Sequence, residues 1–135
     1  MSETPPADSQ PLRDKRILVV EDEFMILLDI QGILESAGAK SIITASHVDD
    51  AMTAIANNQN ADRFDAAVLD LKLDKDSAIP IAERLAKLGI PFIFLTGSPD
   101  DAHLAQDLKS TPIVGKPFDS AALLAALERA ISGTH

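Results

Sequence analysis

The sequence has 135 residues, of which 46% are hydrophobic and 24% charged, a size and balance typical of one soluble globular domain. It holds no cysteine, which excludes disulfides, thiolate nucleophiles and zinc bound by cysteine. A net charge of −9 and an aromatic content of 4% argue against direct binding to nucleic acid. Because no apolar run could span a membrane and no secretory signal starts the chain, we expect a cytoplasmic protein without membrane contact.

The two ends of the chain define the expected domain. Residues 1–14 are polar, rich in proline and without periodicity, which predicts a flexible N-terminal tail. The single predicted domain then covers residues 15–135. Its last helical pattern ends close to the final residue, so we expect no output domain.

Short apolar segments predict the strands. They are almost uninterrupted by polar residues, which is typical of strands buried on both faces of a parallel sheet. These segments are residues 17–20, 42–43, 66–69, 92–95 and 113–114.

Helical periodicities alternate with the strands, at residues 26–37, 48–56, 78–88, 102–108 and 120–131. The first stops at Gly38, and the last follows a cap at Asp119 or Ser120. Strands that alternate with helices in this way predict an α/β fold, a doubly wound parallel sheet with helices on both faces.

Polar side chains stand where the predicted strands end. In open α/β sheets, ligands bind outside these carboxyl ends. The first strand is followed by Glu21 and Asp22, and the third ends at Asp70. Carboxylates 4–5 Å apart would repel each other by about 3–4 kcal/mol per pair unless a cation lay among them. Oxygen ligands without cysteine or histidine favour Mg²⁺ or Mn²⁺.

The same edge carries groups suited to phosphoryl transfer. Asp70 is a candidate carboxylate nucleophile toward phosphorus. Thr96, at the end of the fourth strand, and Lys116, after the fifth, would supply a hydroxyl donor and a positive charge to the transferred group.

These motifs together resemble one known family, the response-regulator receiver domain of two-component signalling. The resemblance covers residues 15–132 and implies a flavodoxin-like (βα)5 fold with strand order 2-1-3-4-5. The motifs are VVEDE at 19–23, AVLDLKL at 67–73, FLTG at 94–97 and GKPF at 115–118.

The resemblance also implies a reaction and a metal site. Asp70 would accept a phosphoryl group from the phosphohistidine of a sensor histidine kinase or a histidine phosphotransferase. Asp22 and Asp70 would bind Mg²⁺ together with the backbone carbonyl of Lys72, and Glu21 would act through a bound water. The protein would gain and lose phosphate by its own chemistry and would not be a conventional metabolic enzyme.

Further family features concern the phosphoryl group and the response to it. Thr96 and Lys116 would contact the phosphoryl group, and the Lys116-Pro117 bond would be cis. Many receivers carry an aromatic switch residue three positions before this lysine, where this sequence has Ile113. The usual aromatic switch is therefore expected to be missing.

A subgroup resemblance adds to this. PFIFLTGS resembles the PFxFATGY signature of the FATGUY receivers, with Leu95 and Ser98 as departures from it. Gly97 gives backbone freedom at the edge of the site. We therefore expect residues 97–110 to carry the response to phosphorylation.

Other functions compete with this interpretation. A phosphohydrolase of the haloacid dehalogenase type needs a second acid two residues after the nucleophile, where this sequence has Lys72. A pseudo-receiver would keep the fold and bind partners without control by phosphorylation. As a working receiver, the chain would act either as a phosphate shuttle or sink, or as a phosphorylation-dependent switch that binds a regulated protein partner.

Overall fold

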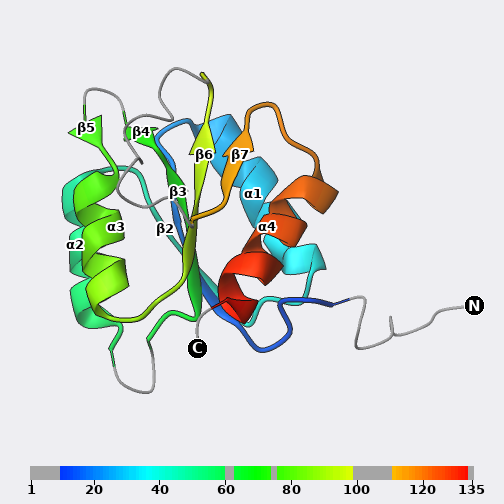
Figure 1. Ribbon diagram of the computed structural model, residues 1–135, viewed down its shortest axis with the longest axis horizontal. Coiled ribbons are helices and arrows are strands. Elements are labelled where there is room, and N and C mark those ends of the chain that lie inside the picture. The colour runs from blue at the N-terminus through cyan, green and yellow to red at the C-terminus, as the bar shows by residue number, and fades with distance from the viewer. Residues whose placement is uncertain (1–9, 60–62, 74–75, 99–110, 134–135) are drawn as a thin grey trace, which may run out of the picture.

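The computed structural model describes residues 10–59, 63–73, 76–98 and 111–133. A parallel sheet of five strands in the order β2-β1-β3-β6-β7 forms its centre, as Figure 1 shows. This is the expected order 2-1-3-4-5, counted over the strands of the main sheet. The elements in chain order are β1 (Arg16–Val20), α1 (Phe24–Ser36), β2 (Ser41–Ala45), α2 (Val48–Asn57), β3 (Ala66–Asp70), β4 (Lys72–Leu73), β5 (Asp76–Ser77), α3 (Ile79–Lys87), β6 (Phe92–Thr96), β7 (Ile113–Gly115) and α4 (Ser120–Ser132).

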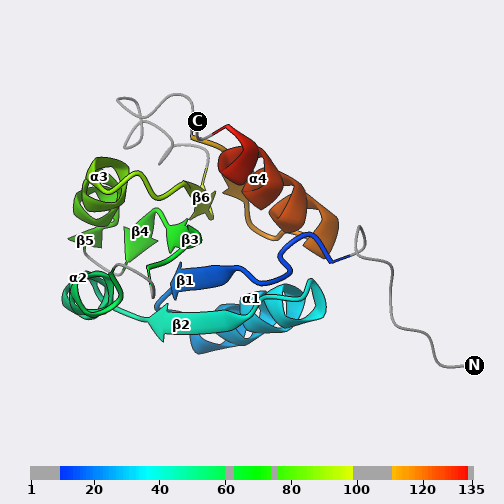
Figure 2. The same cartoon turned by 90° about the horizontal axis from the view of Figure 1, so that it is seen from below.

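Helices cover both faces of the sheet. Figure 2 shows α1 and α4 on one side and α2 and α3 on the other. Successive side chains of a strand point to opposite faces, so β1 serves both cores. Its Leu18 and Val20 belong to the core under α2 and α3, whereas Ile17 and Val19 belong to the core under α1 and α4. Burial on both faces explains why the strands are uninterrupted apolar runs.

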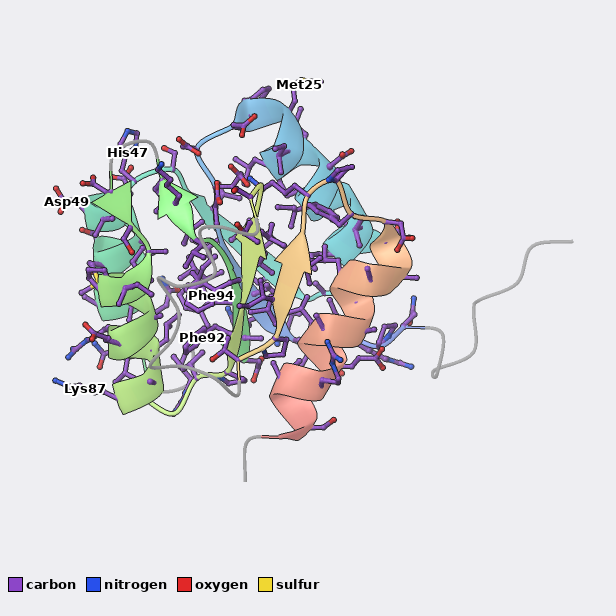
Figure 3. All side chains as sticks on the ribbon, turned by 45° about the horizontal axis from the view of Figure 1, so that its top comes forward. Met25, His47, Asp49, Lys87, Phe92 and Phe94 are labelled. Carbon is purple, nitrogen blue, oxygen red and sulfur yellow. The ribbon has the colours of Figure 1, made fainter. Side chains whose placement is uncertain are left out.

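The aromatic side chains of β6 fill the core on the α2 and α3 side. Phe92 and Phe94 lie on this face of the strand (Figure 3), and their rings meet edge to face with centroids 5.6 Å apart. Their packing fixes the position of β6, whose last residue is Thr96.

The predicted helices agree with the structure where it describes them. The side chain of Asp119 caps α4 by accepting a hydrogen bond from the Ala122 amide at 2.7 Å. The helix α1 begins at Phe24, two residues before the first apolar position of its pattern. The helix expected over residues 102–108 lies outside the described residues. Among the helices that are described, none combines the length and apolar character needed to cross a membrane.

A short antiparallel hairpin follows the strand that ends at Asp70. In it β4 pairs with β5, with Lys72 opposite Ser77 and Leu73 opposite Asp76. Each of its strands has two residues, too short to show a periodicity, so the sequence did not predict them.

The N-terminal segment corrects one expectation. Leu12 is fully buried in the core under α1 and α4, and its amide donates a hydrogen bond to the Ala37 carbonyl at 3.0 Å. Arg13 forms a bridge with Ala39. Residues 10–14 are therefore part of the folded domain, and the prediction of a flexible tail through residue 14 is wrong for them. A lone leucine in a polar stretch gives no periodic signal, so its burial depends on the tertiary structure.

Replacing Leu12 tests this anchor. We expect Leu12→Ala to lower the free energy of unfolding by about 2–4 kcal/mol, because it leaves a cavity in a closed core. Leu28→Ala is the matched control, since Leu28 is 45% exposed, and it should cost less than about 1 kcal/mol. Urea denaturation of both variants measures the difference, and equal effects would show that residues 10–14 do not contribute to the core.

Candidate functional site

The candidate site lies at the carboxyl edge of the sheet, where parallel pairing brings the ends of β1, β3, β6 and β7 together. Glu21 and Asp22 follow β1, and Asp70 is the last residue of β3. Thr96 is the last residue of β6, and Lys116 follows β7. All of the side chains that the sequence singled out at strand ends therefore come from one edge.

The carboxylates gather into a cluster. Glu21, Asp22 and Asp70 each present an oxygen, and these oxygens lie within 4.8 Å of one another. Glu21 is fully buried and Asp70 is 5% exposed, whereas Asp22 is exposed to solvent. The cluster is therefore buried on the side of Glu21 and Asp70. It is open to solvent on the side of Asp22, from which an ion or a substrate can approach.

Lys116 supplies the positive charge of the cluster. Its Nζ donates a hydrogen bond to Oδ2 of Asp70 at 3.1 Å and lies 3.0 Å from Oε1 of Glu21. The carboxylate of Glu23, which is mostly exposed, reaches to 4.0 Å. Burial by itself would lower the pKa of the Lys116 ammonium, but Glu21 and Asp70 outweigh burial and raise it. The lysine is therefore held charged beside Asp70.

The buried carboxylate of Glu21 is only partly hydrogen-bonded. Its Oε2 accepts a hydrogen bond from the Glu23 amide at 3.1 Å. Its Oε1 is buried and, although near Lys116, accepts no aligned hydrogen bond from the described residues. Burial, helped by the neighbouring Asp70, raises the pKa of Glu21 from 4.5 to about 7. A buried carboxylate that is only partly compensated is costly to keep charged.

A hard divalent cation fits this donor set. The cluster offers oxygen ligands only, the kind that Mg²⁺ and Mn²⁺ prefer. Lys116 brings one positive charge to a cluster with three carboxylates, and Oε1 of Glu21 has a lone pair to spare. Asp22 and Asp70 would hold such an ion, with Glu21 beside them. Its positive charge would neutralise the remaining repulsion.

Thr96 occupies a different arrangement from the acids. The residue is 7% exposed, and its hydroxyl donates to the Ser98 carbonyl at 2.7 Å. The same oxygen accepts a hydrogen bond from the Ser98 amide at 3.2 Å. The hydroxyl therefore closes a local turn over residues 96–98, a motif common for serine and threonine.

The remaining predicted residues lie around this edge. The Lys116-Pro117 peptide bond is cis, the isomer that the resemblance implies. Ile113 begins β7 and is 40% exposed, so no aromatic ring stands at the switch position. Gly97 is exposed with open space around it, and Lys72 begins β4 with its side chain in solvent. Most of residues 97–110, where we expected the response, lies outside the described residues.

Sequence reasoning missed the contacts of Glu23 and Ser98. The acidic run before α1 gave no sign that Glu23 approaches Lys116, because these residues are far apart in sequence and meet only in the fold. The pairing of Thr96 with Ser98 had a local signal, since a threonine followed two residues later by a turn residue is the pattern of a side-chain turn.

Comparison with known proteins identifies the family. A family model described as the response regulator receiver domain matches residues 17–128. The chain belongs to the response-regulator receiver family. Its fold is accordingly the flavodoxin-like α/β fold, as the strand order indicates.

Curated relatives are longer proteins. The chain is 34% identical over 116 residues to the transcriptional regulatory protein DltR of Streptococcus agalactiae, covering 83% of this chain and 50% of the relative. It is 33% identical to the alkaline phosphatase synthesis transcriptional regulatory protein PhoP of Bacillus subtilis, covering 78% of this chain and 43% of the relative. The chain thus spans about half the length of these relatives.

Solved structures match over almost their whole length. SdrG from Sphingomonas melonis Fr1 is 30% identical with a TM-score of 0.75, covering 87% of this chain and 97% of that one. The receiver domain of HemR from Leptospira biflexa is also 30% identical, with a TM-score of 0.69 and coverage of 90% and 98%.

The raised pKa of Glu21 predicts a pH-dependent stability of the metal-free protein. The unfolded chain loses the Glu21 proton near pH 4.5, whereas the folded protein keeps it to about pH 7. The contribution of Glu21 to stability is therefore fully present below pH 4.5 and is lost as the pH rises toward 7. Glu21→Gln should remove this loss and gain on the order of 2 kcal/mol over the wild type at pH 8.

Urea denaturation in a chelating buffer at pH 4.5 and pH 8 measures this difference. Glu35→Gln serves as the control, because Glu35 is an exposed acid at the far end of α1. If wild type and Glu21→Gln showed the same pH dependence, Glu21 would be ionised in the folded protein as readily as in the unfolded chain.

A Mg²⁺ ion bound at the acidic cluster would raise the stability of the folded protein. An ion that binds only the folded protein stabilises it by about 2.7 kcal/mol when its concentration is 100 times Kd. We expect Mg²⁺ to raise the Tm of the wild type, and Asp22→Asn to abolish most of that rise. Asp29→Asn, which neutralises an exposed acid on α1, should respond like the wild type. A Tm independent of Mg²⁺ in all of these proteins would contradict a metal site.

Proposed function

We propose that this chain is a response-regulator receiver that accepts a phosphoryl group on Asp70 in a Mg²⁺-dependent reaction. The donor would be the phosphohistidine of a sensor histidine kinase or a histidine phosphotransferase. The observation that carries this proposal is the Asp70 carboxylate at the sheet edge, with the Lys116 ammonium at 3.1 Å and two further carboxylates around it. Membership in the receiver family supports the same chemistry.

The chain's own residues can perform the transfer. A carboxylate oxygen of Asp70 forms a bond to phosphorus while the bond from phosphorus to the donor imidazole nitrogen breaks, and that nitrogen keeps the electron pair. Lys116 leaves its contact with the free carboxylate and pairs with an oxygen of the phosphoryl group. Thr96 donates its hydroxyl proton to another of these oxygens.

The acidic cluster has a supporting role in this proposal. If Mg²⁺ were bound there, it would supply positive charge that screens the carboxylates from the incoming phosphoryl oxygens. We propose Asp22, Asp70 and the backbone carbonyl of Lys72 as its ligands, with Glu21 acting through a water. The exposed position of Asp22 supports access of the ion from solvent. The burial of Glu21 supports a fixed position for its carboxylate.

The phosphorylated protein has two candidate roles. As a shuttle or sink, the chain would pass the phosphoryl group to another histidine or lose it to water. As a switch, it would bind a regulated protein partner in the phosphorylated form. The exposed Ile113 in place of an aromatic residue favours the shuttle or sink, because it removes the usual conformational relay. The PFIFLTGS segment supports placement in the FATGUY subgroup.

We restrict the expected lack of nucleic-acid binding to the domain described here. The curated relatives DltR and PhoP are named as transcriptional regulatory proteins, and the chain spans about half of their length. We therefore confine the expectation to the acidic surface of this domain, whose net charge of −9 repels phosphate.

Phosphorylation with a small donor tests the proposal. Incubation with acetyl phosphate and Mg²⁺ should add the mass of one phosphoryl group to the wild type and none to Asp70→Asn. Asp29→Asn is the matched control and should be modified like the wild type, because Asp29 lies on the exposed surface of α1. Removal of Mg²⁺ with a chelator should also prevent the adduct. Intact-mass spectrometry at short times measures all of these reactions.

The opposite result would favour the pseudo-receiver. If the folded wild type gained no adduct across several donors and times, the chain would not be a phosphate acceptor. Partner binding that is unchanged by Asp70→Asn would then be the expected property.

A further inference from the structure

Glu23 places a negative charge beside the acidic cluster. Its side chain is 66% exposed, and its Oε1 lies 4.0 Å from Nζ of Lys116. The same ammonium lies closer to Glu21 and Asp70, at 3.0 and 3.1 Å, so these two buried acids take most of its positive charge. Glu23 therefore keeps much of its own negative charge, close to the lysine that contacts Asp70.

Capping of the helix that follows does not account for this side chain. Glu23 is the N-cap residue of α1, but its side chain makes no capping hydrogen bond. Its backbone is held, because its amide donates a hydrogen bond to Oε2 of Glu21 at 3.1 Å. A carboxylate at a helix N-terminus also interacts favourably with the helix dipole, but that interaction does not require a position next to Lys116. The backbone thus fixes the place of Glu23, while its carboxylate lies in solvent beside the site.

A phosphoryl donor has to reach Asp70 from the exposed side of the cluster. Asp70 is 5% exposed and Glu21 is fully buried, so the protein interior closes the opposite side. Glu23 directly follows Asp22, the exposed member of the cluster, and these two exposed acids lie where the donor arrives. A phosphoryl group is negatively charged, so a nearby carboxylate repels it. A cation among the clustered acids would offset Asp22, whereas Glu23 is not one of the residues that offer it a ligand.

We propose that Glu23 is a specificity-determining residue that selects phosphoryl donors with a basic side chain next to the phosphorylated histidine. The inference rests on the proposed function, since it requires transfer to Asp70. A donor without such a cation meets only the repulsion between its phosphoryl group and the Glu23 carboxylate. A donor with a lysine or arginine beside its phosphohistidine pairs that cation with Glu23, so the same carboxylate attracts it. Attraction of one partner and repulsion of others together produce specificity.

Acetyl phosphate tests the repulsion, because it is an anionic donor that brings no cation. The rate at which it phosphorylates the full chain is followed by intact-mass spectrometry, with Mg²⁺ at a saturating concentration for each variant. We expect Glu23→Gln to raise the second-order rate constant about three- to tenfold at low ionic strength, and Glu23→Lys to raise it further. Added salt should reduce both gains, because it screens interactions between exposed charges.

Glu35→Gln is the matched control for the removal of a charge. It neutralises an exposed carboxylate at the far end of α1, so its rate with acetyl phosphate should equal that of the wild type. Thermal unfolding of the same variants measures any structural role. If Glu23→Gln lowered the Tm but left the rate unchanged, Glu23 would serve only the N-terminus of α1 and the proposal would be wrong.

Two phosphohistidine peptides test the attraction. One has an uncharged sequence around the phosphohistidine, and the other is identical except for a lysine next to it. The wild type should react faster with the lysine peptide, by about threefold or more in the second-order rate constant at low ionic strength. Glu23→Gln should lose most of this preference, and Glu23→Lys should reverse it. A preference for the lysine peptide that persisted in Glu23→Lys would contradict the proposal.

The outcomes separate donor selection from the proposed function. If the wild type and both Glu23 variants formed the Asp70 adduct at equal rates with every donor, Glu23 would not select donors and the phosphate acceptor would stand. A gain with acetyl phosphate but no lysine preference in the wild type would also overturn the selection, because Glu23 would then only repel. If the folded wild type formed no adduct with any donor, the proposed function would fail and the selection with it.

Discussion

The charge balance between Lys116 and the buried carboxylates governs the stability and the chemistry of the site. A parallel sheet brings acids from two strand ends within 4.8 Å, and two of the three are withdrawn from solvent. Repulsion of this kind would destabilise the edge if no positive charge were present. Lys116 lies 3.0 Å from Glu21 and 3.1 Å from Asp70, and it compensates part of the charge. The negative charge that Lys116 leaves uncompensated would attract a divalent cation.

This incomplete balance links structure to chemistry. A fully neutral cluster would be more stable but would have no affinity for a metal ion, and a carboxylate engaged on all sides could not attack phosphorus. Oε1 of Glu21 accepts no aligned hydrogen bond from the described residues, which is the kind of local cost that functional sites tolerate. The two hydrophobic cores that pack the sheet on both faces supply the stability that offsets it.

Thr96 is tied to the same edge by hydrogen bonds of both its side chain and its backbone. Its hydroxyl serves the Ser98 backbone in this structure, while its own backbone is held by the sheet. Ile113, at the start of β7, has an aliphatic side chain that is 40% exposed.

The order of residues along the chain was enough to predict the sheet and the residues at its edge. Uninterrupted apolar runs mark strands buried on both faces, and the polar residue after each run must lie at the carboxyl edge, so Asp70, Thr96 and Lys116 could be named without a structure. The burial of Leu12, the approach of Glu23 to Lys116 and the commitment of the Thr96 hydroxyl to Ser98 emerged only in the folded molecule. The physical reason is that periodicity reports which face of an element is apolar, whereas these contacts depend on distances between segments and on single rotamers. Such contacts leave no repeating pattern in the sequence for periodicity to detect.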